Sequence, residues 1–311
     1  MKRIVRKIQF IGLGNMGLAL ALNLYDQGYA ISVWLRSKSP SIKKAKQSGF
    51  TIHQLDDHTS FDQTPLIMSF PDEQHLNFLK KYHQSIEPKT PIIFLHGLSL
   101  HQHRLRELFP QLNLILLAPK GIAREIRQRY LNHLSSPAFY QLSSKHRSLT
   151  IVKKLAKDMS LILGPKAVTA EMEVLSDLFS EQSLLCTLLP YSCAHSFEML
   201  INKGVDPHLA YAECWFEIML IAKAMIETGP EDFFKLISPT ARAGAIKVMK
   251  KLSKDQLFEK MYLELINDIE NQNFYQELPQ YLKQNIPQLK SQKKLQQIHQ
   301  AWRGALYETK T

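Results

Sequence analysis

The chain has 311 residues, 45% of them hydrophobic and 22% charged, so it is long enough for two globular domains and too apolar for a disordered protein. Lysine and arginine outnumber aspartate and glutamate by 39 to 28, and the resulting net charge of +11 suits anionic ligands. The basic residues are spread along the chain, so we expect no nucleic-acid binding. Three cysteines without a C-x-x-C pair indicate a reducing cytoplasm, and the lack of an uninterrupted apolar stretch of about 18 residues argues against a membrane protein.

A glycine-rich loop follows the first predicted strand, Lys7 to Ile11, and leads into a predicted helix through Leu24. The loop has the pattern G-x-G-x-x-G in the strand, loop and helix context of dinucleotide-binding domains. The first glycine permits the turn, the second lets the backbone approach a pyrophosphate, and the third allows close packing of the helix. The helix N-terminus favours the anion. We therefore predict that a dinucleotide binds at Gly12, Gly14, Asn15, Met16 and Gly17.

The second predicted strand, Ala30 to Leu35, ends in Arg36, where an NAD-binding protein usually carries an acid for the ribose 2′-hydroxyl. A cation at this position suits the 2′-phosphate of NADPH. The residues after it, among them Lys38, Ser39 and Ser41, add a second positive charge and hydroxyl groups. NADPH is therefore the predicted cofactor, and the alternative is an ordinary polar loop.

Three more buried strands are predicted at Leu66 to Phe70, Pro91 to Leu95 and Leu112 to Leu117, and a helical segment from Glu73 to Ile86 separates the first two. Alternating strands and helices imply a parallel sheet. Each strand is followed by polar residues at its carboxyl end, where open sheets bind ligands. These residues are Pro71 and Asp72, which we expect to contact the cofactor, then His96, and then Lys120. Taken alone, such a histidine or lysine is as often a packing residue as a functional one.

The region after the sheet is predicted to be helical. A helix from Ile151 to Leu163 and a short last strand from Ala167 to Thr169 complete the first domain, residues 1–170. Residues 171–311 form the second domain, with Gly229-Pro230 as a break between helices. The predicted fold class is thus α/β, a Rossmann-type doubly wound parallel sheet followed by an all-α C-terminal domain. The amphipathic segment from Lys247 to Thr311 is expected to serve in packing and dimer formation.

Two pairs of carboxylates in the helical region have members four residues apart, Asp177 with Glu181 and Glu213 with Glu217. Four residues are about one helical turn, so both members of a pair project from one side. Apolar residues lie between them (Leu178, Phe179, Trp215 and Phe216), and burying the carboxylates there without a cation would be costly. Carboxylate oxygens suit Mg²⁺, and nothing nearby has the His and Cys spacing of zinc sites. We predict that these four residues serve a Mg²⁺ site, the alternative being two acidic helix faces in solvent.

Several of these motifs together resemble the short class of ketol-acid reductoisomerases. That family has D-L-F-G-E-Q and E-C-L-H-E where this chain has D-L-F-S-E-Q, from Asp177, and E-C-W-F-E, from Glu213. Its P-D-E, A-H-G-F and A-P-K-G motifs are similar to the three strand ends, and its S-N-T-A is similar to the segment that begins at Ser238. Its phosphate-binding loop, L-R-x-G-S-x-T, aligns with Arg36, Ser39 and Ser41. The similarity runs in one order from Gly12 to about Tyr275.

The resemblance implies a reaction and a set of roles. Mg²⁺ would be ligated by Asp177 and Glu181 and completed, largely through water, by Glu213 and Glu217 from the partner subunit of a homodimer. The substrate would be a 2-hydroxy-2-alkyl-3-oxo acid such as acetolactate, in which an alkyl group migrates before NADPH delivers a hydride. The implied active-site residues are His96, Lys120, Glu217 as acid/base, and Ser238 on the substrate carboxylate.

The chain departs from the family pattern next to several of these residues. It has Phe216 and Ile218 on either side of Glu217 where the family writes H-E-L-K, Arg242 where the family has the acid of T-A-E, and Ile122-Ala123-Arg124 in place of P-G-H. Neighbours of ligands set ligand orientation and basicity. Two alternatives therefore stay open, a nucleotide-binding paralogue with lost or altered activity and a metal-free NADPH-dependent keto-acid reductase. The four retained carboxylates favour the enzyme, because a metal-free site would gain nothing from burying them.

Overall fold

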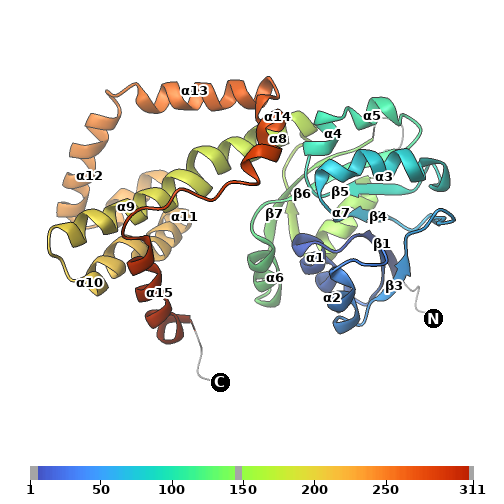
Figure 1. Cartoon of the computed structure of the whole chain (residues 1–311), viewed down its shortest axis with the longest axis horizontal. Coiled ribbons are helices and arrows are strands. Elements are labelled where there is room, and N and C mark those ends of the chain that lie inside the picture. Colours follow the sequence, from blue (N-terminus) through green and yellow to red (C-terminus); the bar gives the residue numbers. More distant parts are fainter. Residues whose placement is uncertain (1–5, 144–148, 308–311) are drawn as a thin grey trace. The chain divides into compact units, whose positions relative to one another are not determined.

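The computed structural model describes residues 6–143 and 149–307 and divides into two compact units, Met1–Ser176 and Asp177–Thr311. The first unit is α/β and the second is helical, as Figure 1 shows. This architecture confirms the predicted fold class. The division falls within helix α8 (Ala170–Ser180), whereas the sequence analysis placed the domain boundary at residue 170.

A sheet forms the centre of the first unit, with eight strands among the described residues in the order β3-β2-β1-β4-β5-β6-β7-β8. All neighbouring strands are parallel except β6 and β7, which are antiparallel. The strands are β1 (Arg6–Ile11), β2 (Tyr29–Leu35), β3 (Thr51–Gln54), β4 (Leu66–Met68), β5 (Pro91–Phe94), β6 (Asn113–Pro119), β7 (Ser136–Gln141) and β8 (Leu161–Leu163).

The register of the central strands brings the predicted ligand-binding loops to one edge of the sheet. Ile11, the last residue of β1, pairs with Trp34 of β2 on one side and with Met68 of β4 on the other. The glycine-rich loop therefore emerges between the ends of β2 and β4, where the strand order reverses. Open α/β sheets bind their ligands at this switch point.

Helices cover both faces of the sheet. One hydrophobic core joins Phe10 and Val33 to helices α1, α2, α6 and α7, and the other joins Met68 and Phe94 to α3, α4 and α5. This arrangement is the predicted doubly wound layer structure. The helices are α1 (Asn15–Asp26), α2 (Ser41–Gln47), α3 (His75–Tyr82), α4 (Leu98–Gln102), α5 (Leu105–Leu108), α6 (Ala123–Leu131) and α7 (Leu149–Asp158), with short 3-10 turns at Asp72–Gln74 and His83–Ser85.

The end of the sheet differs from the sequence analysis. The helix predicted from Ile151 to Leu163 ends at Asp158, and its last apolar residues form β8 instead. Ser160 has a positive φ of 57°, which turns the chain and ends the helix. The strand predicted from Ala167 to Thr169 is wrong, because this segment is irregular, although Val168 N donates a hydrogen bond to Tyr140 O at 2.9 Å. Strands β3 and β7 were not predicted.

The second unit is built from consecutive helices, two stretches of which are π-helical. Its core contains Phe197 and Tyr211, against which α15 packs. Two side-chain hydrogen bonds fix α15, from Trp302 Nε1 to His208 Nδ1 at 2.9 Å and between Tyr211 Oη and His299 Nδ1 at 3.0 Å. The segments are η3 (Glu181–Leu188, π), α9 (Leu189–Asn202), α10 (Pro207–Tyr211), η4 (Ala212–Phe216, π), α11 (Glu217–Leu236), α12 (Pro239–Leu252), α13 (Leu257–Glu270), α14 (Asn273–Tyr281) and α15 (Gln292–Tyr307).

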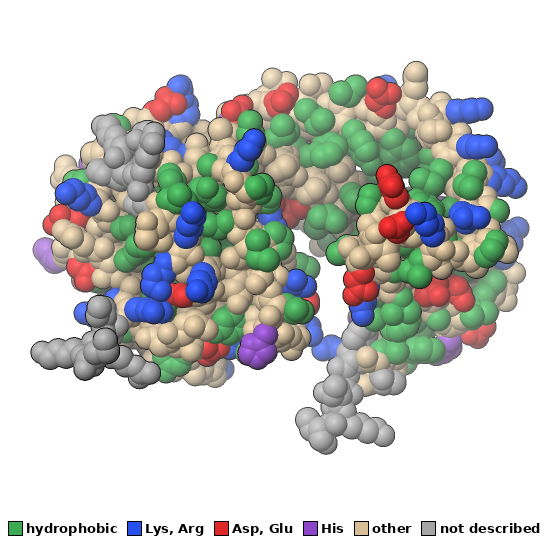
Figure 2. All heavy atoms as spheres, turned by 180° about the vertical axis from the view of Figure 1, so that it is seen from behind, with side chains coloured by type: hydrophobic (Ala, Val, Ile, Leu, Met, Phe, Trp, Pro, Cys, Tyr) green, Lys and Arg blue, Asp and Glu red, His purple; other side chains and the backbone are tan. Residues whose placement is uncertain are grey.

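Helices α11 and α12 present apolar side chains to solvent. Neither helix has a buried residue, although both are described along their whole length. Gly229, with φ of 82°, kinks α11 at the predicted Gly-Pro break. Figure 2 shows hydrophobic side chains over the surface of the helical unit. The large exposed hydrophobic residues of these two helices are Met219, Leu220, Ile221, Met225, Ile226, Leu236, Ile246, Val248, Met249 and Leu252.

Candidate active site

The glycine-rich loop is packed against the end of β4 at Ser69. Gly14 N donates a hydrogen bond to Ser69 O at 2.9 Å. Gly12 has φ of +76°, and a Cβ there would lie 2.8 Å from both Ser69 O and Phe70 Cβ. At Gly17 a Cβ would lie 1.6 Å from Ser69 Oγ. Both positions therefore require glycine for the close packing that the sequence analysis assigned to this loop.

Helix α1 begins directly after this loop and leaves its N-terminus available to an anion. Its first residue is Asn15, its N-cap is Gly14, and no side chain in the described part of the chain caps it. The first turn carries no acidic residue. Free backbone N–H groups and the helix dipole make such an end a binding site for a pyrophosphate. Met16 lies in this first turn and packs against the core below it.

The residues predicted to bind a 2′-phosphate lie at the end of β2 and the start of α2. Arg36 is exposed immediately after the strand. Ser41 Oγ donates to Leu13 O at 3.0 Å, and Ser41 N donates to Ser39 Oγ at 3.3 Å, so the α2 N-terminus is tied to the glycine-rich loop.

A cation that the sequence analysis did not assign to the site also reaches this loop. Lys44 Nζ donates to Asn15 Oδ1 at 3.2 Å. Its position three residues after Ser41 on α2 puts both side chains on one face, and this spacing was the available sequence signal. The loop between β1 and α1 is thus flanked by Lys44 and lies beside β2, which Arg36 follows.

A buried glutamate that the sequence analysis missed organises the loops after β5 and β6. Glu173 is 2% exposed. One of its carboxylate oxygens accepts a hydrogen bond from Gly97 N at 2.7 Å, and the other accepts from Lys120 Nζ at 2.5 Å. The first of these oxygens also lies 3.8 Å from His96 Nε2. The structure therefore brings the predicted His96 and Lys120 together through a residue that belongs to α8.

Gly97 makes this arrangement possible. A Cβ at this position would lie 2.6 Å from the Glu173 carboxylate and 2.7 Å from Ala170 O. Any larger residue would push α8 away from the loop that carries His96. The sequence signal for Glu173 was weak, because an acid in the first turn of a helix is common as a simple dipole partner.

Asp72 lies in the segment that follows β4 and faces two imidazoles. One of its oxygens is 3.6 Å from His75 Nδ1, and the other is 3.9 Å from His96 Nδ1. The residue follows Pro71 and begins a 3-10 turn that leads into α3. Its carboxylate therefore lies between the imidazoles of His75 and His96, and the prediction of cofactor binding did not include these contacts.

The two predicted acidic pairs flank the two π-helical stretches of the second unit. Asp177 stands one turn before Glu181, where η3 begins. Glu213 lies in η4, and Glu217 begins α11 directly after it. π-helical insertions occur frequently at functional sites. In the single chain Asp177 is half-buried and the other three are exposed, so one chain alone does not bury them as expected.

Asp177, Glu181 and Glu213 contribute a negative local potential at neighbouring thiols. Burial, and next the carboxylates of Glu181 and Asp177, raise the pKa of the Cys186 thiol. Burial, and next Glu213, raise the pKa of Cys214 in the same way. A cation bound at either pair would offset this potential.

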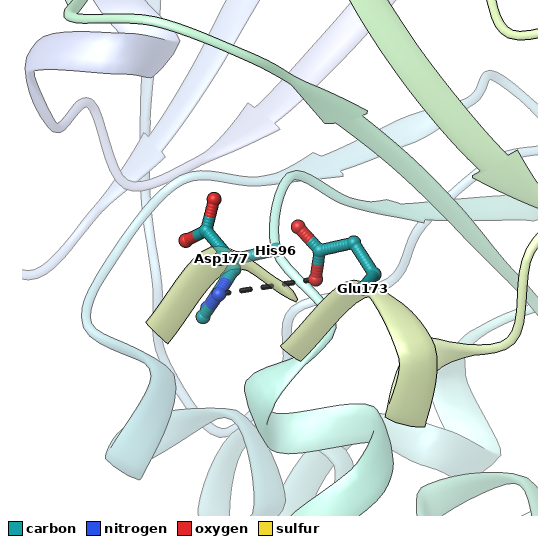
Figure 3. Close-up of side chains that lie close together, drawn as sticks. All are labelled: His96, Glu173 and Asp177. Atoms are coloured by element: carbon teal, nitrogen blue, oxygen red, sulfur yellow. Dashed lines mark ion pairs between the residues drawn. The ribbon is translucent and has the colours of Figure 1, made fainter. Parts of the chain in front are cut away.

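A second grouping of possible metal ligands includes α8. His96, Glu173 and Asp177 each offer a ligand atom within 4.8 Å of the others, and Figure 3 shows their side chains close together. Both oxygens of Glu173 already accept hydrogen bonds, and the Lys120 ammonium at 2.5 Å would repel a cation bound there. Glu173 is therefore poorly suited to hold a cation.

Ser238 caps α12 at its N-terminus. Its Oγ accepts a hydrogen bond from Ala241 N at 3.2 Å, and the side chain is exposed. The hydroxyl proton is not used by this cap, so it can be donated to an acceptor such as a carboxylate. Arg242 stands one turn later on the same helix and is also exposed.

Comparison with known proteins identifies the family. The model of the acetohydroxy acid isomeroreductase NADPH-binding domain matches residues 4–166, and the model of the ketol-acid reductoisomerase C-terminal domain matches residues 171–305. The chain is 33% identical over 297 residues to a ketol-acid reductoisomerase (NADP(+)) of Helicobacter pylori (strain Shi470), covering 93% of this chain and 88% of that protein. It is 28% identical over 295 residues to that of Methanosphaera stadtmanae, covering 94% and 88%.

A solved structure shares the same fold over nearly the whole chain. The NADH-preferring ketol-acid reductoisomerase from an uncultured archean superimposes with a TM-score of 0.78 at 24% identity, covering 98% of this chain and 95% of that one. The two family models together span both structural units in the order in which the motifs occur. The chain therefore belongs to the ketol-acid reductoisomerase family of oxidoreductase-isomerases.

Proposed function

We propose that this chain is an NADPH- and Mg²⁺-dependent ketol-acid reductoisomerase that acts on a 2-hydroxy-2-alkyl-3-oxo acid such as acetolactate. The observation that carries the proposal is the retention of all four carboxylates at the two π-helical stretches, Asp177 and Glu181 at one and Glu213 and Glu217 at the other. An altered paralogue without metal chemistry would have no use for two such acidic pairs.

The preference for NADPH rests on the charge around the glycine-rich loop. Arg36 is exposed at the end of β2, and Lys44 is hydrogen-bonded to the first residue of α1. Neither position is an acid that could accept the ribose 2′-hydroxyl of NADH. The named relatives from Helicobacter pylori and Methanosphaera stadtmanae are NADP(+) enzymes, whereas the structural neighbour prefers NADH. The cations of this chain favour the first group.

The donor set suits Mg²⁺. In this proposal Asp177 and Glu181 would hold the ion, and Glu213 and Glu217 would complete the site. All four are hard carboxylate ligands, three of them exposed in the single chain and so open to an ion that retains several waters. When bound, Mg²⁺ supplies Lewis-acid polarisation of the substrate oxygens for the migration of the alkyl group.

The remaining roles belong to the chain's own side chains. Ser238 donates its hydroxyl proton to the substrate carboxylate, and Glu217 takes and returns a proton as acid/base. Lys120 supplies a positive charge that the buried Glu173 holds in place, and the same carboxylate fixes Gly97 N beside His96. The N-terminus of α1 would hold the cofactor pyrophosphate.

A homodimer explains the apolar surface of the helical unit. Helices α11 and α12 bury none of their residues within one chain, and a soluble monomer rarely exposes so many large hydrophobic side chains on adjoining helices. A second copy that covers them would also supply the second acidic pair. Among the described residues, the run Ala170–Asn202 is long and apolar enough to cross a membrane by length and composition, and in this proposal it instead carries Asp177 and Glu181 as metal ligands.

We propose a cytoplasmic location for this enzyme. All three cysteines are free, and the reaction needs none of them. A reducing compartment keeps such thiols unpaired.

One assay tests the proposal. NADPH oxidation is followed with acetolactate as substrate, with and without Mg²⁺. We expect turnover that requires Mg²⁺. NADPH binding without turnover would identify a nucleotide-binding paralogue, and turnover of a keto acid that is unchanged by removal of Mg²⁺ would identify a metal-free reductase.

A further inference from the structure

A buried histidine outside the family motifs joins the two loops that carry Asp72 and His96. His75 begins α3 and is 3% exposed. Its Nδ1 lies 2.7 Å from Ser99 Oγ, and its Nε2 lies 3.0 Å from Phe70 O. Phe70 immediately precedes the Pro71-Asp72 turn at the end of β4. Ser99 follows His96 by three residues after β5. The imidazole therefore spans both strand-end loops.

The chemistry of the two partners fixes the state of the ring. A backbone carbonyl can only accept a hydrogen bond, so His75 Nε2 must carry a proton and donate it to Phe70 O. In the neutral ring Nδ1 is then an acceptor and takes the hydroxyl proton of Ser99. Burial lowers the pKa of His75, against the raising effect of Asp72, which favours this neutral form. A neutral imidazole is the form that can bond both loops at once.

The neighbours of His75 leave little room for another arrangement. Its ring packs edge-on against Phe70 and Phe94, with centroids 4.6 Å and 5.3 Å away. The strand end that follows Phe94 carries His96, and Gly97 N is bonded to Glu173. A shift of one loop against the other would change the 3.9 Å separation of Asp72 and His96 Nδ1.

We propose that His75 is a positioning residue for the active site, which holds Asp72 and His96 in register by bridging Phe70 O and Ser99 Oγ. It does not touch substrate or cofactor in this role. It acts through the two loops, and the proposal rests on the proposed function only in so far as activity is used as a readout.

Three variants test the bridge. His75→Leu removes both hydrogen bonds and keeps an apolar side chain in the aromatic pocket. Ser99→Ala removes only the hydroxyl and serves where the first variant folds poorly. Thr90→Val is the matched control, because Thr90 is also fully buried and lies just before β5, away from the bridge.

The first readout is steady-state turnover of acetolactate, with NADPH and Mg²⁺, per folded molecule. We expect kcat to fall about tenfold or more in His75→Leu, with the KM for NADPH nearly unchanged, since supporting residues around a site typically contribute that much. Ser99→Ala should give a smaller loss, and the double variant should be no worse than His75→Leu, because both act on one bridge. A lower melting temperature with unchanged kcat would mean a purely structural role and overturn the proposal.

The second readout needs no turnover. The ¹⁵N signals of the His96 ring, assigned with His96→Gln protein, report its environment directly. They should move or broaden in His75→Leu and stay in place in Thr90→Val. If wild-type protein fails to convert acetolactate, the proposed function fails, and these signals still decide the bridge. Identical His96 signals in wild type and His75→Leu would refute it.

Discussion

Replacing Glu173 by glutamine should destabilise the α/β unit and impair the site together. The carboxylate is buried, 2.5 Å from Lys120 Nζ and 2.7 Å from Gly97 N. Glutamine keeps the size of the side chain and one acceptor for Gly97 N. It removes the charge that compensates Lys120, whose side chain remains only 25% exposed.

The magnitude follows from the burial of the pair. Removal of one partner of a buried ion pair costs about 3–5 kcal/mol, because the other charge is left uncompensated. The quarter of Lys120 that meets solvent reduces this cost, so we expect the free energy of unfolding to fall by about 2 kcal/mol. Chemical denaturation of wild type and Glu173→Gln at neutral pH measures the difference. The transition midpoint should move to lower denaturant with an unchanged slope.

Two controls separate the charge from the packing. Lys120→Met with Glu173→Gln removes both charges, and the double variant should recover part of the loss from the single variant. Glu107→Gln removes the charge of an exposed ion pair with Arg104 and should change stability little. Equal denaturation midpoints for wild type and Glu173→Gln would refute the account of this buried pair.

Three further predictions concern cofactor choice, pH and assembly. NADPH should bind at least about tenfold more tightly than NADH, since one charge-assisted hydrogen bond to the 2′-phosphate contributes about 1.5–3 kcal/mol. In calorimetry, Arg36→Asp should weaken the binding of NADPH far more than that of NADH. Equal dissociation constants for the two cofactors in wild type would contradict this. Burial lowers the pKa of His75 in the folded protein, so as the pH drops below about 6.5 the imidazole is protonated in the unfolded chain before it is protonated in the folded one. The free energy of unfolding should therefore decrease as the pH drops, until the folded-state pKa is passed. Denaturation at pH 7 and 5 should show this loss in wild type and less of it in His75→Leu. Light scattering should find a dimer, and mixing Asp177→Asn with Glu213→Gln protein should restore some activity, whereas a monomer would contradict the shared site.

The layer structure of the first unit follows from sequence patterns that are local. Strands such as β1 and β5 are short apolar runs with turn residues after them, and their burial on both faces is typical of parallel sheets. β3 and β7 lack that pattern. β3, at the edge of the sheet, has no fully buried residue and no alternation of buried and exposed residues, and β7 contains Pro137 and pairs antiparallel with β6. β8 continues the apolar spacing of α7, and only the positive φ of Ser160 separates them.

Candidate site residues can be predicted where one motif carries the chemistry, but contacts between distant segments cannot. Glu173 contacts residues 53 and 76 positions earlier, and nothing in its own helix indicates those partners. His75 likewise reads as an ordinary first residue of an amphipathic helix, and its bridge depends on Ser99, 24 positions later. Lys44 belongs to a short basic cluster whose contact with Asn15 depends on how α2 packs. Contacts of this kind can be identified only from the three-dimensional structure, in which the loops lie together.

The metal is the part of the account on which the proposed chemistry depends. Titration of Mg²⁺ into NADPH-loaded protein by calorimetry, in wild type and in Asp177→Asn, tests it most directly. Because an amide cannot replace the charge of a direct carboxylate ligand, Mg²⁺ binding and acetolactate isomerisation should fall by orders of magnitude in the variant while NADPH binding stays almost unchanged. The account is contradicted if wild-type protein binds no Mg²⁺ in the presence of NADPH, or if Asp177→Asn binds it as tightly as wild type.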